Sequence, residues 1–129
     1  MGRMIFPNLA VKDLPATVTF WRNLGFEFNE QFSSDEAACM VVNEQASVML
    51  LQQDFFHGFH QTEPHTGTET MIALSAESRG DVDELCAKAR EEGASDVEVK
   101  DQGPGMYGGS FRDLDGHIWE LLWMELDAA

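Results

Sequence analysis

Near its end the chain carries a single carboxylate, Glu120, within an otherwise apolar run from Ile118 to Met124. A carboxylate in such surroundings can take up a proton as a general base, or it can hold the polar group of a ligand. It can equally be a structural side chain that Arg112, Asn8 or water satisfies. The sequence leaves both interpretations open.

A second group with possible chemistry consists of His57, His60 and His65. A helical turn would place His57 and His60 on one face, because they are three residues apart. No carboxylate accompanies them in a suitable register, so solvated loop histidines are the simpler interpretation and adventitious metal binding is the alternative. The sequence has no phosphate-binding glycine motif, and no Ser–His–Asp or Cys–His arrangement stands out.

Composition narrows the possible partners. The 129 residues include 8 Lys and Arg against 23 Asp and Glu, a formal net charge of −15. Such a surface repels phosphate backbones and anionic lipid headgroups, so we expect neither nucleic-acid nor membrane partners. Cys39 and Cys86 are too few for a disulfide framework. Because no secretory or membrane-spanning run is apparent, a cytoplasmic location is expected.

The elements that must position these residues follow from periodicity. Leu14, Val18 and Trp21 form one helical stripe, which Asp13 can cap and Gly25 can end. Apolar or alternating runs between turn residues predict strands in this first half over 4–11, 26–32, 37–43 and 46–52.

The same order then recurs. Asp81 and Glu84 resemble a capping pair for a second helix, which Gly93 closes. Strands are predicted in this half over 70–76, 96–100, 106–113 and 117–125. The chain therefore reads as one domain, 1–129, made of two βαβββ modules, about 1–52 and about 69–129. The linker between them, about 53–68, contains a short phenylalanine-rich turn.

Two segments carry a resemblance to a known family. The segment Asp-Leu-Asp-Gly-His-Ile-Trp-Glu at 113–120, the opening Asn-Leu-Ala-Val-Lys-Asp-Leu at 8–14 and the repeat itself resemble the vicinal oxygen chelate superfamily. That group includes glyoxalase I, the bleomycin-resistance proteins and the extradiol dioxygenases. The likeness covers essentially the whole chain and is nearest to small glyoxalase-like (lactoylglutathione-lyase-like) proteins, although Leu114 stands where the family usually has proline.

The resemblance implies an α+β fold in which two βαβββ modules form an eight-stranded curved mixed sheet. This sheet is a cup, with helices on its convex face and the ligand on its concave face. Enzymes of the family hold a divalent metal there on four residues. The corresponding positions in this chain are Phe6, Leu50, Met71 and Glu120. Phe and Leu have no donor atom, and a thioether suits soft copper rather than zinc or iron(II). We therefore expect no metal ligands and no cofactor.

Strand alternation predicts which side chains face the cup. The candidate ligand-binding residues are Phe6, Asn8, Leu50, Met71, Tyr107 and Glu120, with Tyr107 in a glycine-rich lip over 103–109. Glu120 is also the candidate catalytic residue.

Three functions remain open. The first is a metal-free protein that binds an apolar or aromatic small molecule, as drug-sequestering members of the family do. The alternative is a glyoxalase-like lyase, isomerase or dioxygenase that uses Glu120 and an unrecognised metal site. A structural dimer with a filled cup is the third. A homodimer is expected, with Phe28, Phe32 and Trp123 as interface candidates.

Overall fold

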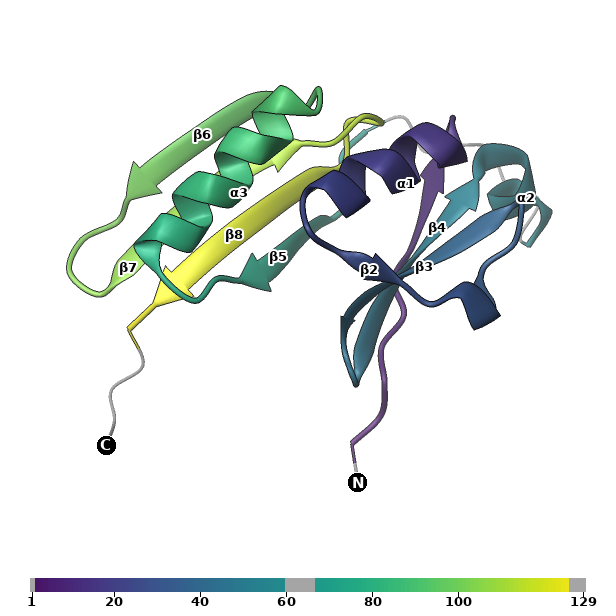
Figure 1. Cartoon of the computed structure of the whole chain (residues 1–129), viewed down its shortest axis with the longest axis horizontal. Coiled ribbons are helices and arrows are strands. Elements are labelled where there is room, and N and C mark those ends of the chain that lie inside the picture. Colours follow the sequence, from purple (N-terminus) through teal and green to yellow (C-terminus); the bar gives the residue numbers. More distant parts are fainter. Residues whose placement is uncertain (1, 60–66, 126–129) are drawn as a thin grey trace. The chain divides into compact units, whose positions relative to one another are not determined.

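The computed structural model describes residues 2–59 and 67–125. The chain divides into two compact units, residues 1–65 and 66–129, and each is described by itself (Figure 1). His60 and His65 lie outside the described residues, so the predicted histidine group is represented by His57 alone, in the short helix α2.

The first unit is a four-stranded mixed sheet with one long helix. Its strand order is β1-β4-β3-β2, in which β1 runs parallel to β4 and the other neighbours are antiparallel. Its elements in chain order are β1 (Asn8–Val11), α1 (Leu14–Asn23), β2 (Glu27–Phe28), the 3-10 helix η1 (Glu30–Phe32), β3 (Ala37–Asn43), β4 (Ala46–Gln52) and α2 (Gln53–Gly58).

The second unit repeats this topology. Its strand order is β5-β8-β7-β6, in which β5 runs parallel to β8 and the other neighbours are antiparallel. Its elements are β5 (Met71–Ser75), α3 (Arg79–Glu91), β6 (Ser95–Asp101), β7 (Met106–Arg112) and β8 (Ile118–Met124). The predicted α+β class and its two βαβββ modules are confirmed, and each module contains an open sheet.

Helix α1 begins and ends as predicted. The Asp13 side chain accepts a hydrogen bond from the Ala16 N–H at 3.1 Å, and proline occupies the first turn. After the helix, Gly25 has a φ of 103°, a left-handed conformation that favours glycine. The stripe buries Leu14 and Trp21, which are 4% and 1% exposed, on the sheet side of the helix.

Helix α3 begins before the predicted capping pair, so that prediction was wrong. Ser78 is the N-cap, and its Oγ accepts a hydrogen bond from the Asp81 N–H at 3.0 Å. The Asp81 carboxylate in turn accepts from the Glu77 N–H at 3.0 Å. This reciprocal pairing satisfies two backbone donors at the helix start, which places Asp81 in the first turn of the helix.

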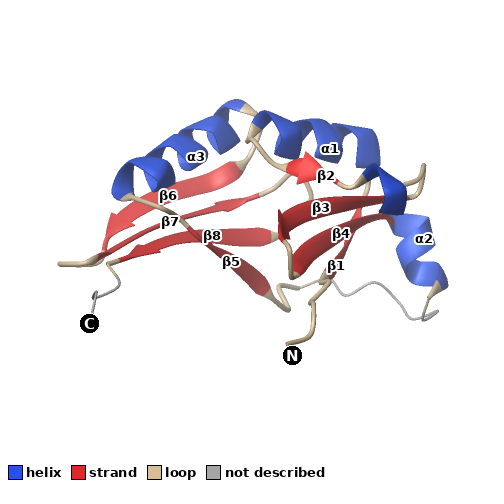
Figure 2. Cartoon of the chain, turned by 60° about the horizontal axis from the view of Figure 1, so that its bottom comes forward, coloured by secondary structure: helices blue, strands red, loops and turns tan. Residues whose placement is uncertain are grey.

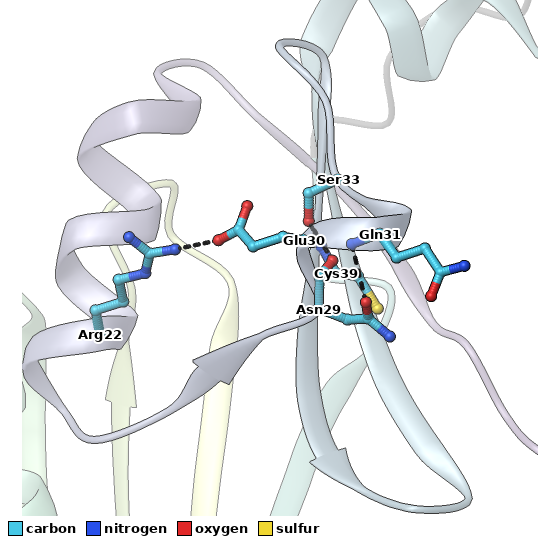
Figure 3. Close-up of polar contacts among 6 residues, drawn as sticks. All are labelled: Arg22, Asn29, Glu30, Gln31, Ser33 and Cys39. Atoms are coloured by element: carbon cyan, nitrogen blue, oxygen red, sulfur yellow. Dashed lines mark hydrogen bonds and ion pairs between the residues drawn. The ribbon is translucent and has the colours of Figure 1, made fainter.

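The predicted strand over 26–32 is also wrong, because only Glu27–Phe28 pairs with β3. Figure 3 shows the cause: the Asn29 side chain accepts a hydrogen bond from the Gln31 N–H at 3.0 Å and caps η1. Ser33 then ties the turn to β3, since its hydroxyl donates to Asn29 O and accepts from the Cys39 N–H. Side chains that bond nearby backbone groups in this way compete with strand pairing.

In the second unit α3 covers one face of the sheet (Figure 2). Its contact face consists of Val82, Cys86 and Ala89, each at most 2% exposed. The buried sheet residues on this side include Phe111, Trp119 and Leu121. The opposite face of the same sheet is therefore the one left for a ligand. Within the described residues, no helix is long and apolar enough to cross a membrane.

Candidate functional site

The candidate site lies on the face of the second unit's sheet that points away from α3. Side chains alternate along a strand, so the burial of Trp119 and Leu121 on the helix side places Glu120 on the other side. Backbone pairing aligns Glu120 with Ser110 on β7 and with Ala73 on β5, and aligns Ser110 with Glu98 on β6. These four residues form one row across the sheet.

A cavity of about 400 Å³ opens on this face. Gly108 and Ser110, two small residues on β7, alternate along its floor. The longer side chains of the neighbouring strands stand beside them. The residues that line the cavity, which we call the β7 trough, are Glu98, Lys100, Gln102, Met106, Gly108, Gly109, Ser110, Glu120, Leu121 and Leu122.

Gly108 makes room for the Gln102 side chain at the middle of the trough. A Cβ at this position would lie 2.9 Å from Gln102 Nε2 and 3.6 Å from Leu122 Cδ1. The Gln102 amide therefore lies above Gly108, in the space that a larger side chain on β7 would fill. The row through this point is Lys100, Gly108 and Leu122.

Three charged side chains line the trough. In the part of the chain that the structure describes, the side chains of Glu98, Lys100 and Glu120 form no ion pair or hydrogen bond with other protein groups. Arg112, further along β7, differs: it pairs with Asp96 at 3.1 Å and donates to Gly116 O at 2.9 Å. The trough thus presents two carboxylates and one ammonium group to a ligand.

A neighbouring cavity of about 380 Å³ continues over the same sheet. It shares Glu98 and Ser110 with the trough and extends to Arg112 and Ile118. Ser110 therefore lies where the two hollows meet, beside Glu120.

Besides Glu120, the predicted site residue Met71 lies on this open face of the second unit. Met71 pairs with Ile118 in the row beside that of Glu120, and it is 56% exposed. In the first unit, Asn8 is likewise on the face away from α1, since the neighbouring Leu9 and Val11 are buried. Its amide donates to Phe6 O at 2.7 Å, and Phe6 is 47% exposed.

Leu50 was predicted to face the ligand, and its placement was wrong. It pairs with Leu9, which lies on the α1 side of the sheet, and it is 0% exposed. Met49 pairs with Asn8, just as Glu120 pairs with Ala73, so Met49 holds the place in the first module that corresponds to Glu120. A one-residue shift along a strand moves every side chain to the other face.

Tyr107 does not line the trough either. It pairs with Trp123 on the α3 side of the sheet, and its hydroxyl donates to the Asp83 carboxylate at 2.6 Å. That hydrogen bond raises the pKa of the Tyr107 phenol. The guanidinium of Arg79 lies 5.2 Å from the Tyr107 ring centre and 5.1 Å from that of Trp123. The predicted glycine-rich lip is also only partly a loop, because Gly108 and Gly109 lie within β7.

Sequence reasoning missed Glu98, Lys100, Gln102 and Ser110, and it placed Gly108 in a lip rather than in a strand along the floor. A signal for them was present. The first three alternate with Val97, Val99 and Asp101, a pattern that places them on one face of a strand. The two small residues alternate in the same way on the next strand.

The residues at the family's metal positions do not fit a divalent cation. With the register corrected, they are Phe6, Met49, Met71 and Glu120. One carboxylate oxygen donor and two thioethers are not a ligand set for zinc, nickel or iron(II). Among the described residues, no group of three or more His, Cys, Asp or Glu could hold a metal ion.

Comparison with known proteins identifies the family. Residues 3–121 match the model of the Glyoxalase/Bleomycin resistance protein/Dioxygenase superfamily. The chain belongs to this superfamily. A search of curated proteins gives no match.

Several solved structures share the fold. A hypothetical protein from S. aureus is 32% identical, with a TM-score of 0.81 and 95% of each chain covered. A family enzyme from Burkholderia phytofirmans is 14% identical, with a TM-score of 0.81 over 94% of this chain and 98% of that one. A fosfomycin resistance protein from Listeria monocytogenes is 21% identical, with a TM-score of 0.71 over 95% and 93%. The last two likenesses concern the fold alone.

Proposed function

We propose that this superfamily member binds a small molecule in the β7 trough without the help of a metal ion. The observation that carries the proposal is the trough itself, a hollow of about 400 Å³ with Glu120 on its wall and small residues on its floor. Its volume falls within the range of roughly 300–1,000 Å³ that is typical of small-molecule sites.

The lining suggests the kind of ligand. Met106 and Leu122 offer apolar surface to an apolar or aromatic body. The Glu120 carboxylate offers a hydrogen-bond acceptor and a negative charge to a cationic group. The formal net charge of −15 also concentrates cations near the surface.

The metal-free part of the proposal rests on donor chemistry. Of the four residues at the family's metal positions, only Glu120 carries an oxygen donor. We therefore assign it a direct role in ligand binding. Metal analysis of protein purified without chelator should find well under one equivalent of zinc, nickel, manganese or iron. Stoichiometric metal that is lost in Glu120→Gln would contradict this assignment.

A titration followed by amide NMR shifts tests the binding site. Benzylamine combines an aromatic body with an ammonium group, and benzyl alcohol is its uncharged counterpart. Benzylamine should shift amides of β7 and β8, benzyl alcohol should bind more weakly, and Glu120→Gln should remove most of the difference. The control is Glu91→Gln, which makes the same charge change on an exposed face of α3. Shifts confined to other parts of the chain, or no shifts at all, would show that the trough is not the site.

A further inference from the structure

We propose that the β7 trough selects a dipolar ligand. Its cationic group would lie over Ser110 between Glu98 and Glu120, and its acidic group would lie beside Lys100. This inference rests on the proposed function and adds a class of ligand to it. It follows from the order of charges along β7.

The cationic end is set by the row that contains both carboxylates. Glu98 and Glu120 flank Ser110 from the two neighbouring strands. Strands are about 4.8 Å apart, so the backbones at Glu98 and Glu120 are roughly 10 Å apart. Two glutamate side chains on the same face can both reach a cation held above the serine hydroxyl. Neither carboxylate has an ion-pair partner among the described residues.

The acidic end is set by the next row. Lys100 and Leu122 flank Gly108, about 7 Å further along β7. Because Gly108 has no side chain, the Gln102 amide lies directly over β7 here and lines the trough together with Lys100. The Lys100 ammonium supplies a positive charge, and the amide supplies an N–H donor. Both groups suit a carboxylate or a similar anion.

The two rows together discriminate between ligand charges. A purely cationic ligand meets repulsion from Lys100, and a purely anionic ligand meets repulsion from Glu98 and Glu120. A ligand whose opposite charges are about 7 Å apart, one step of two residues along the strand, satisfies both rows. This spacing is longer than that of an α-amino acid and fits an ω-amino acid with a flexible apolar chain.

Three probes of matched chain length test the inference. They are 6-aminohexanoate, which is dipolar, hexylamine, which is cationic, and hexanoate, which is anionic. Amide NMR titration should give 6-aminohexanoate about fivefold tighter binding than hexylamine, the ratio that corresponds to one exposed ion pair of roughly 1 kcal/mol. Hexanoate should bind most weakly, and the shifts should follow β6, β7 and β8.

Substitutions test which residues bind the acidic group of the ligand and which bind its cationic group. Lys100→Met should abolish the preference for 6-aminohexanoate over hexylamine without weakening hexylamine binding. Glu98→Gln should weaken the binding of both amines. Lys88→Met is the matched control, because it removes the same charge from α3, where Lys88 pairs with Glu84 at 3.2 Å. Glu98 and Lys100 are exposed and the Lys88 side chain is 44% exposed, so the variants should keep the dispersed spectrum of the folded protein.

The outcomes separate the two proposals. If hexylamine binds the wild-type protein as tightly as 6-aminohexanoate, or if Lys100→Met leaves their ratio unchanged, the dipolar inference is wrong and the trough remains a binding site. If neither these probes nor benzylamine shifts the amides of β6–β8, the proposed function is wrong as well.

Discussion

Gly109 of β7 lies directly beneath the thiol of Cys86 in α3. A Cβ at position 109 would lie 2.5 Å from Cys86 Sγ and 3.0 Å from Val82 Cγ1. The preceding residue, Gly108, faces the opposite side of the sheet, where the flexible Gln102 amide is the nearest group. Two consecutive glycines thus serve different purposes: Gly109 admits the helix, and Gly108 admits the Gln102 side chain that lines the trough.

This difference predicts unequal effects of the same substitution. Gly109→Ala should lower the free energy of unfolding by about 1–3 kcal/mol, because the helix must move or the core must be overpacked. Gly108→Ala should change it much less, since the Gln102 side chain can turn aside, but it should weaken probe binding in the trough. Urea denaturation of both variants provides the measurement. Equal losses of stability would contradict the assignment of the two faces.

The corrected register of β4 gives a second pair of variants. Leu50 is 0% exposed and Met49 is half-buried. Leu50→Ala should therefore lower the free energy of unfolding by about 2–5 kcal/mol, the usual result of leaving a cavity in a core. Met49→Ala should have a smaller effect. A larger loss of stability for Met49→Ala in thermal or chemical denaturation would support the register predicted from the sequence, in which Leu50 faces the ligand.

Asp113 is a buried carboxylate in the turn between β7 and β8, only 5% exposed. One of its oxygens accepts from the backbone N–H groups of Asp115 and His117, and the other accepts from Trp119 Nε1 at 2.9 Å. Burial nevertheless raises the pKa of this carboxyl, and the hydrogen bonds offset the increase only in part. The native state therefore keeps this proton to a higher pH than the unfolded chain does.

The sign of the pH dependence follows from that difference. The contribution of Asp113 to the free energy of unfolding is fully present below the unfolded pKa of about 3.9, and it is lost as the pH rises through the folded pKa. The stability of the wild-type protein minus that of Asp113→Asn should accordingly fall as the pH is raised across this window. Urea titrations of both proteins at several pH values test this. A difference that grows with pH would mean that the folded pKa is lowered.

A homodimer remains our proposal for the assembly. Of the predicted interface candidates, Phe32 is 62% exposed, whereas Phe28 lies below the Arg22 guanidinium and Trp123 below that of Arg79. Light scattering at micromolar concentration should give twice the chain mass of 14.4 kDa. Phe32→Glu should shift the equilibrium toward the monomer if the dimer uses this side chain. A mass of 14.4 kDa for the wild-type protein would refute the dimer.

Capping and periodicity were sufficient to predict most of the fold. Asp13 and Gly25 mark the two ends of α1, and the sequence reveals them because the groups that satisfy helix ends lie close in sequence. The segment 26–32 was predicted as a strand, but the local hydrogen bonds of Asn29 and Ser33 compete with strand pairing there. Nothing in the alternation of apolar residues reveals such a competition.

The site was less predictable because it depends on pairing between strands. In β4 both faces are apolar, so alternation alone could not decide between Met49 and Leu50. In β8 the single charge of Glu120 fixed the register correctly. The trough depends on the neighbours of Ser110 on β6 and β8, and a single strand's sequence does not identify its neighbours.

The alternation of β7 also separates two kinds of mutational constraint. Positions 109 and 111 face α3, so changes in size there act on stability. Positions 108 and 110 face the trough, where a change in size reshapes the space for a ligand and leaves the helix contact untouched. Substitutions at every second position of this one strand can therefore change which ligand the protein binds. Because the helix contact is unchanged, the thermal stability of the fold need not decrease as the ligand changes.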